Sequence, residues 1–212
     1  MSEIDATDPE NPSRDRLADS VLANAVFDGW GHSAIEAAGR QLALPAGEAE
    51  RLFPGGTFEV IDWLDRRTTE RMVQELAQRD LKALRIRERV ALAVRLRLEP
   101  LNAHREGLRR AAKLMATPLH ARRGAGAVWR TVDAIWHGLG DTSTDYNYYT
   151  KRALLAGVYG STMLVWFDDK SEGCANTWAF LDRRIENVMQ IEKLKGQLSK
   201  LVDRGRTATR RA

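Results

Sequence analysis

The longest uncharged stretch of this chain constrains its fold more than any other feature. Fifteen residues from Ala153 to Phe167 carry no charge, with Lys151-Arg152 before them and Asp168-Asp169 after them. As a helix of about 1.5 Å per residue, this stretch is about 22 Å long, which is short of the roughly 30 Å hydrocarbon core of a bilayer. A helix that is apolar on every side and too short to span is usually buried in a helical domain. We therefore expect an all-α protein built around residues 153–167.

The rest of the chain agrees with a soluble helical protein. A length of 212 residues with 43% hydrophobic and 29% charged residues suits one domain with a real core. No sustained alternating pattern bounded by hairpin turns occurs, so we expect no sheet. The single cysteine, Cys174, excludes an internal disulfide and is expected to be inert. Residues 1–12 are acidic and polar, unlike a signal or mitochondrial transit peptide, which favours a cytoplasmic location.

Small residues share one side of the uncharged helix. Ala153, Ala156, Gly157 and Gly160 recur at helical spacings of three, four and seven. A strip without side chains either lets a neighbouring backbone approach closely or leaves a slot for an apolar ligand. Both alternatives stay open on the pattern alone.

The N-terminal part predicts three short helices. Their expected ranges are 13–29, 32–44 and 45–53, and Pro54-Gly55-Gly56 closes the last of them. Two short helices joined by a tight turn form a helix-turn-helix unit. With a long helix before the pair and Phe53 closing the third helix, residues 13–56 resemble the N-terminal domain of TetR-type regulators.

Charge argues against DNA binding by this unit. Residues 1–56 carry four basic and ten acidic side chains, a net charge of −6, whereas the remainder has a net charge of +10. The helix that would enter the major groove offers Glu48, Glu50 and a single Arg51. Because phosphate neutralisation dominates affinity for DNA, we expect no nucleic-acid partner.

The middle of the chain is predicted to be helical throughout. Apolar spacing indicates helices over residues 57–78, 80–99 and 101–117. Arg87 falls on the apolar side of the second, which suggests a buried ion pair. The Arg-rich outer surface is expected to be solvated, with attraction to anionic lipid headgroups as the alternative. Residues 122–126 are expected to form a loop.

The turn before the uncharged helix has several recognisable signals. Gly138 and Gly140 are expected to end one helix, and residues 141–144 supply N-cap candidates for the next. Tyr146, Tyr148 and Tyr149 cannot share one helix face, so at least one should point outward. An exposed aromatic pair beside two cations is typical of a binding hot spot, and packing on adjacent helices is the alternative.

The last predicted helix, residues 174–202, has two apolar seams. The first contains Trp178, Leu181, Ile185 and Val188 and should pack on the core. The second contains Ile191, Leu194, Leu198 and Leu201 and forms either a dimer seam or an amphipathic surface on a membrane.

No catalytic or metal constellation is recognisable. The four histidines lie outside the Glu-x-x-His and His-Glu-x-x-His patterns, and no cysteine pair or Gly-rich phosphate loop occurs. Asp133 and His137 are four residues apart and are interpreted as a structural pair. Asp168-Asp169 is interpreted as solvated. We predict a protein that is not an enzyme, with no cofactor and no metal.

The segment D-x-S-T-D-x-N-x-Y-T-[RK]-R, here Asp141 to Arg152, and the later W-x-F-L-x-x-R, here Trp178 to Arg184, resemble a known family. These are the lipid-binding accessory proteins of ubiquinone biosynthesis, the ninth Coq protein and its bacterial relatives. The resemblance covers residues 125–190 strongly and the whole chain more weakly.

The resemblance implies a TetR-like fold that has given up DNA binding. It implies a bound lipid or isoprenoid quinone precursor, which we place at the small-residue slot and its neighbours, Ala156, Gly157, Tyr159, Gly160, Met163 and Trp166. It further implies a surface for a di-iron demethoxyubiquinone hydroxylase, mapped to Ile135, Trp136, Tyr148, Tyr149 and Arg152. His137-Gly138-Leu139 departs from the aromatic residues expected after Trp136.

The expected organisation follows from these readings. Residues 1–12 form a disordered acidic tail, 13–56 the helix-turn-helix-like unit, 57–203 the helical lipid-binding domain and 204–212 a basic tail. We expect a bacterial homodimer that is peripheral to the inner membrane. The alternative is a TetR-type, ligand-responsive transcriptional regulator whose inducer fills the slot.

Overall fold

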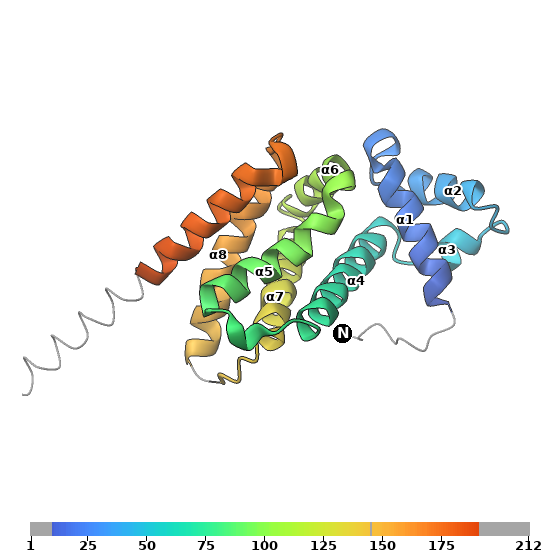
Figure 1. The fold of residues 1–212 in the computed structure, drawn as a ribbon. Helices are drawn as coiled ribbons and strands as arrows, with labels where there is room; N and C mark the ends of the chain where they lie inside the picture. The colour runs from blue at the N-terminus through green and yellow to red at the C-terminus, as the bar shows by residue number, and fades with distance from the viewer. Residues whose placement is uncertain (1–9, 145, 191–212) are drawn as a thin grey trace, which may run out of the picture.

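The protein is all-α in the computed structural model, which describes residues 10–144 and 146–190 (Figure 1). No strand occurs among these residues, and the predicted fold class is confirmed. The main helices are α1 (Asn11–Asp28), α2 (His32–Gln41), α3 (Glu48–Leu52), α4 (Thr57–Ala77), α5 (Ile86–Leu98), α6 (Arg105–Met115), α7 (Ala121–Gly138), α8 (Tyr146–Asp168) and a final helix over 175–190. Short 3-10 segments join some of them at Leu81–Ala83, Glu99–His104 and Glu172–Cys174.

Helices α1, α2 and α3 enclose a small core of their own. It contains Leu17, Val21, Ile35, Leu52 and Phe53, all almost completely buried. The chain reverses between α2 and α3 through Ala43 and Gly47, both with positive φ. The three predicted helices are therefore present, although α1 begins at Asn11 instead of Ser13.

The N-terminal unit is fixed to the larger bundle through α1 and α6. Gly107 on α6 lies under α1, where an added Cβ would come within 3.1 Å of the Ala25 Cβ and 3.3 Å of the Leu22 carbonyl oxygen. The indole nitrogen of Trp30 donates to the Gly107 carbonyl at 2.8 Å. A side chain at position 107 would therefore push the two helices apart.

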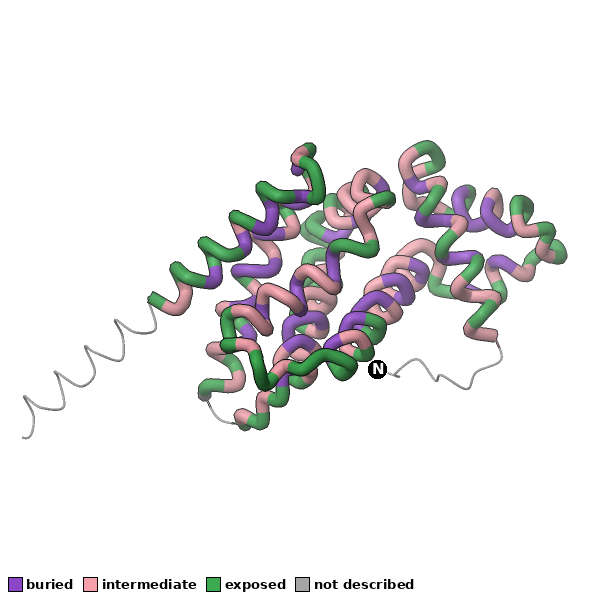
Figure 2. The backbone as a smooth tube through the Cα atoms, in the orientation of Figure 1, coloured by how far each residue is buried: buried purple, intermediate pink, exposed green. Residues whose placement is uncertain are grey.

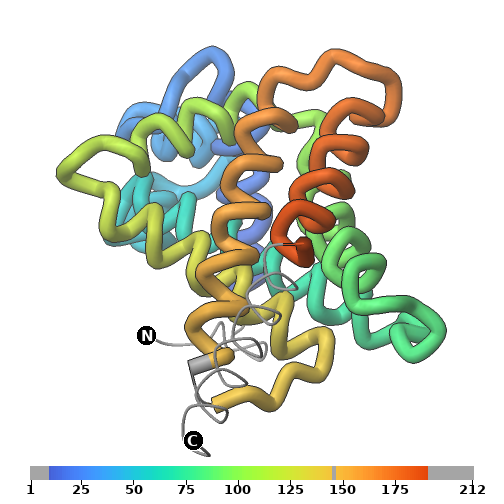
Figure 3. The backbone as a smooth tube through the Cα atoms, turned by 90° about the vertical axis from the view of Figure 1, so that its left-hand side faces the viewer, coloured from blue at the N-terminus to red at the C-terminus, as the bar shows by residue number. Residues whose placement is uncertain are grey.

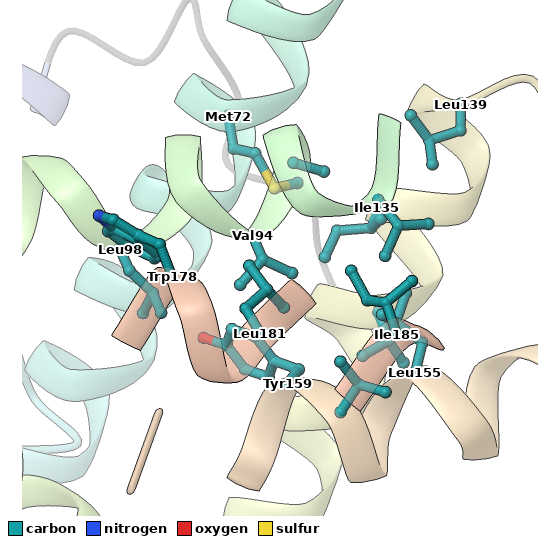
Figure 4. Packing of buried hydrophobic residues seen from close by; sticks show 14 of the residues in the cluster. Met72, Val94, Leu98, Ile135, Leu139, Leu155, Tyr159, Trp178, Leu181 and Ile185 are labelled. Atoms are coloured by element: carbon teal, nitrogen blue, oxygen red, sulfur yellow. The ribbon is translucent and has the colours of Figure 1, made fainter. Parts of the chain in front are cut away.

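The larger core lies between α4, α5, α7, α8 and the final helix. Its buried members include Met72, Val94, Ile135, Tyr159 and Leu181, which Figure 4 shows packed together. Buried residues follow the inward faces of these helices (Figure 2). Helix α8 and the final helix lie side by side at the end of the molecule opposite α1–α3 (Figures 1 and 3). In the described part of the chain, the uncharged helix is thus covered on its inner side.

Helix α5 starts later than its apolar pattern predicted. It begins at Ile86, where the Glu88 carboxylate accepts a hydrogen bond from the Arg85 backbone at 2.8 Å and fixes the N-terminus. Leu84 precedes the helix and so does not define its buried face. Arg87 is exposed, and the buried ion pair predicted there was wrong. The buried arginine of α5 is Arg97.

Residues 122–126 belong to α7, and the prediction of a loop there was wrong. The two glycines suggested a break, but Gly124 serves a close contact. An added Cβ at this position would lie 3.0 Å from the Met115 carbonyl oxygen and 3.2 Å from its Cβ. Gly138 ends α7 as predicted, and Gly140 takes a positive φ of 81°.

Asp169 was predicted to be solvated, but it is buried and holds the start of the final helix. Its carboxylate accepts hydrogen bonds from the Thr177 amide at 2.8 Å, the Thr177 hydroxyl at 2.6 Å and the Ser171 amide at 2.8 Å. Burial opposes ionisation, yet these donors from Ser171 and Thr177 hold the pKa of Asp169 well below its ordinary value. Asp168 is exposed. The second seam predicted for the last helix, from Ile191 onward, lies outside the described residues.

Candidate functional site

A cavity of about 340 Å³ lies between α4, α5, α6, α7 and α8. Its lining is almost entirely apolar, with Leu98 and Leu101 on one wall and Trp166 and Phe167 on another. Trp30, from the connection between α1 and α2, also reaches it. Both parts of the protein therefore contribute to one apolar space.

Small residues on α6 and α7 create this space. Those that line it, together with Ala116 just after α6, are Ala111, Ala112, Ala121, Gly124, Ala125 and Ala127. Two helices that face each other with short side chains leave volume that the surrounding large residues do not fill. The alanine and glycine content of residues 111–127 is the sequence signal for this cavity, and the sequence interpretation missed it.

Three of the six predicted lipid-binding residues line the cavity. Tyr159, Met163 and Trp166 lie on its α8 wall, at spacings of four and three residues along one helix face. The other three, Ala156, Gly157 and Gly160, are not part of the lining. The uncharged helix thus forms a cavity wall with its large side chains and not with its small ones.

The strip of small residues lies on the outer side of α8. A Cβ built at Gly157 or Gly160 would meet no atom within 4 Å, so no backbone of residues 10–144 or 146–190 packs against them. Ala153, Gly157 and Leu164 are exposed on that side. The lipid-binding role of the six residues remains a prediction, and close packing within the chain does not explain the glycines.

One wall of the cavity carries charge. The Arg97 guanidinium donates to the Asp65 carboxylate at 2.7 Å. Arg130 reaches the same carboxylate at 3.3 Å and Asp62 at 3.2 Å. These four side chains come from α4, α5 and α7 and tie the three helices together behind the apolar surface.

A second polar cluster joins the end of α7 to the start of α8. Arg152 donates through Nε to Asp133 and through Nη1 to Asp141 at 3.3 Å. Its guanidinium carbon lies 3.4 Å from the centre of the Tyr148 ring, and the Tyr148 hydroxyl donates to Asp133 at 2.9 Å. Lys151 donates to Asp141 at 2.6 Å. This cluster, which we call the corner network, consists of Asp133, Asp141, Tyr148, Lys151 and Arg152.

The corner network favours ionised carboxylates. Burial acts to raise the pKa of Asp141, but hydrogen bonds from Lys151, Ser143 and Arg152 lower it to about 2. Burial likewise opposes ionisation of Asp133, whose pKa is lowered by the hydrogen bonds from Arg152 and Tyr148. The predicted Asp133–His137 contact exists, with His137 Nδ1 3.5 Å from the Asp133 carboxylate.

Two aromatic rings cover the corner network on the outside. Tyr149 has 63% of its surface exposed and stacks on Trp129 of α7, with ring centroids 6.4 Å apart. The Tyr148 ring meets Tyr149 edge to face at 5.1 Å. We call Trp129, Tyr148 and Tyr149 the aromatic platform. The expectation of at least one outward tyrosine is met by Tyr149.

Comparison with known proteins links the corner network to a family. The COQ9 family profile matches residues 121–192, which include α7, α8 and the described part of the final helix. "Ubiquinone biosynthesis protein COQ9, mitochondrial" from Bos taurus is 30% identical over 190 residues, covering 86% of this chain and 59% of the relative. The protein of the same name from Drosophila melanogaster is 29% identical over 188 residues, covering 87% of this chain and 57% of the relative. This chain is similar to COQ9 proteins over most of its length.

The likeness to COQ9 proteins spans most of this chain but about three fifths of the length of those relatives. Among solved structures, the crystal structure of the TetR transcriptional regulator from Nitrosomonas europaea ATCC 19718 superposes with a TM-score of 0.68 at 23% identity. It covers 82% of this chain and 97% of the regulator. The predicted TetR-like fold is confirmed.

The five predicted partner-binding residues lie at different depths. Ile135 and Arg152 are completely buried, so the expectation that they form a surface was wrong. Helix α7 points Ile135 into the core, and the carboxylates of the corner network enclose Arg152. Tyr149 is exposed, while Trp136 and Tyr148 are half-buried. The sequence interpretation missed Trp129, which lies under Tyr149.

Other chemistry-bearing groups are few among residues 10–144 and 146–190. Cys174 is buried, and its sulfur lies 3.4 Å from the Asn102 side-chain oxygen. His32, Glu36 and Glu50 bring three ligand atoms within 4.8 Å of one another on the surface of the N-terminal unit. Of the helices in the described part of the chain, none combines the length and apolarity that crossing a membrane requires.

Proposed function

We propose that this chain is a non-catalytic, lipid-binding accessory protein of ubiquinone biosynthesis. In this proposal it holds an isoprenoid or quinone precursor and presents it to a di-iron hydroxylase. The observation that carries the proposal is the apolar cavity of about 340 Å³ inside a chain that is similar to COQ9 proteins. Ligand sites of this kind are concave, mostly apolar and enclosed by several elements.

The aromatic platform supports a protein partner. Large aromatic side chains that are half exposed and rigidly held are typical of interface hot spots. Tyr149 and Trp129 stack on each other above the corner network, which fixes their backbone from below. We propose that the hydroxylase contacts this platform and Trp136, while Arg152 and Ile135 act from beneath by holding its shape.

The lipid part of the proposal is tested by extracting gently purified protein and identifying lipids by mass spectrometry. We expect an isoprenoid or another lipid to co-purify with the wild-type chain. Ala112→Phe places a ring in the cavity and should reduce the bound lipid at least tenfold. Ala179→Phe, on an exposed position of the final helix outside the lining, is the matched control and should leave the lipid content unchanged. Absence of lipid from the wild-type protein, together with no binding of added lipid, contradicts the proposal.

A ligand-responsive DNA-binding regulator is the second candidate, because the fold is that of a TetR regulator. The unit that would bind DNA argues against it. Helix α3 has five residues, two of them glutamates, and its Arg51 is paired with Glu48 and Glu10 at 2.7 Å each. A gel shift with genomic fragments at increasing salt separates the two functions. Saturable, sequence-specific binding favours the regulator.

A homodimer and contact with the inner membrane belong to the same proposal. The exposed outer side of α8, with Ala153, Gly157 and Leu164, offers a flat apolar face for a second subunit. Light scattering of the purified chain tests the dimer, and co-flotation with anionic phospholipid vesicles tests the membrane contact.

A further inference from the structure

One wall of the apolar cavity contains polar atoms that the protein itself leaves without partners. Thr131 on α7 is 1% exposed, yet its hydroxyl makes no hydrogen bond. Arg97 on α5 is 5% exposed, and its Nε–H has no acceptor. Both residues line the cavity. Buried polar groups nearly always have a hydrogen-bond partner, so two unpartnered groups at one wall require an explanation.

Thr131 differs from the other buried threonines on the helices. Thr68 donates to the Leu64 carbonyl at 2.7 Å, and Thr162 donates to the Val158 carbonyl at 2.8 Å. This bond to the preceding turn is the usual way in which a helical threonine satisfies its hydroxyl. Thr131 does not make it, and its hydroxyl has no hydrogen-bond partner in a residue that lines the cavity.

Tyr159 adds a third polar group to this wall from α8. Its side chain lines the cavity, and Figure 4 shows its oxygen directed toward the side of the core where Leu98 lies. Burial raises the pKa of Tyr159; the charge of Arg97 acts to lower it and the charge of Asp65 to raise it. The phenol is therefore neutral at physiological pH and able to donate or accept a hydrogen bond.

The charges behind this wall leave no cation for an anionic ligand. The charged side chains that line the cavity are Asp62, Asp65 and Arg97, and Arg97 is paired with Asp65. Arg130 and Arg123 both pair with Asp62, and neither lines the cavity. A phosphate buried here would need positive charge that is already neutralised. The groups of this wall that remain available are hydrogen-bond donors, and these suit a neutral oxygen acceptor.

We propose that Thr131, Arg97 and Tyr159 form a head-group subsite that binds the neutral, hydrogen-bond-accepting oxygen of a long apolar ligand, in preference to a phosphate. The tail then lies along the alanine-lined wall of α6 and α7. This inference rests on the proposed lipid-binding function and names the chemistry of the ligand's polar end.

Three probes with the same chain test it: farnesol, farnesyl diphosphate and the hydrocarbon farnesene. Binding is followed by the fluorescence of the tryptophans, of which Trp30 and Trp166 line the cavity. We expect farnesol to bind at least fivefold more tightly than either of the others. Thr131→Val, which replaces the hydroxyl with a methyl group, should weaken farnesol about fivefold and leave farnesene within twofold. Thr162→Val, a buried threonine outside the lining, should change neither.

Tyr159→Phe provides a second variant if Thr131→Val does not fold, and it should weaken farnesol in the same selective way. Tighter binding of farnesyl diphosphate than of farnesol overturns the neutral-head subsite, and so does unchanged farnesol affinity in the folded variants. Neither result contradicts the proposed lipid-binding function. If none of the three probes binds the wild-type chain, the proposed function fails as well.

Discussion

Two arginines are almost completely buried in the described part of the chain, and their surroundings differ. Arg152 in the corner network contacts two carboxylates, the Tyr148 carbonyl and the Tyr148 ring. Arg97 at the cavity wall pairs with Asp65 and keeps one N–H without an acceptor. A buried donor without a partner costs about 1–3 kcal/mol. We infer that the saturated network holds structure, whereas the unsaturated one is kept for a ligand.

The largest effect is expected from removing Arg152. Arg152→Met leaves the half-buried Asp133 without its main cation and Asp141 with Lys151 alone, and it should lower the free energy of unfolding by about 3–5 kcal/mol. Urea unfolding measures this. Arg87→Met is the control, because Arg87 is exposed, and it should change stability by no more than about 0.5 kcal/mol. A loss below about 1 kcal/mol for Arg152→Met contradicts a structural role for the corner network.

Acid should weaken the same network. The pKa of Asp141 is about 2 in the folded chain and about 3.9 when unfolded, so its contribution is complete above pH 4 and is lost as the pH falls through 2. Asp141→Asn removes this contribution. The stability difference between wild type and Asp141→Asn should therefore shrink by about 2 kcal/mol between pH 4 and pH 2. A difference that is constant over this range shows that Asp141 is not stabilised in its ionised form.

Two threonine substitutions should change stability in opposite directions. Thr131→Val removes a hydroxyl that has no partner and should stabilise the ligand-free protein by about 1 kcal/mol. Thr162→Val removes a hydroxyl bonded to the Val158 carbonyl and should destabilise by about 1 kcal/mol. Thermal unfolding of both variants after delipidation measures the difference. If Thr131→Val destabilises like Thr162→Val, the hydroxyl is satisfied in the folded protein.

The smallest stability effect belongs to the aromatic platform. Tyr149→Ala removes an exposed ring and should lower the free energy of unfolding by about 0.5 kcal/mol. It should weaken the proposed hydroxylase complex at least tenfold, because exposed aromatic anchors dominate interfaces. Leu119→Ala, at an exposed apolar position before α7, is the control and should leave the affinity unchanged. Equal affinities of the wild type and Tyr149→Ala contradict the platform as a partner surface.

The sequence predicted elements better than it predicted which face each element buries. The all-α fold, the three N-terminal helices and the end of α7 at Gly138 follow from local signals such as apolar spacing and glycines. Arg87 was assigned to the wrong environment because Leu84 was counted in a helix that starts two residues later. Arg87 shares a helix side with Val90 and Val94, but it lies in the first turn of α5, where Ile86 is exposed as well.

Long-range packing explains the remaining differences. Gly124 was interpreted as a loop residue, but the contact that requires it is with Met115, on another helix. The small residues of α8 suggested the cavity wall, while the space comes from alanines on α6 and α7. No pattern within one helix tells which neighbour it faces. The sequence could not predict the unpartnered hydroxyl of Thr131 either, because a missing hydrogen bond is a property of the folded structure.

Native mass spectrometry of the intact protein tests the central claim, that the cavity holds a lipid, most directly. The wild-type chain and Ala112→Phe are incubated with the same isoprenoid alcohol and sprayed under identical conditions. We expect one bound molecule per wild-type chain and almost none on Ala112→Phe. Equal loading of the two proteins, or no bound molecule on either, contradicts the claim.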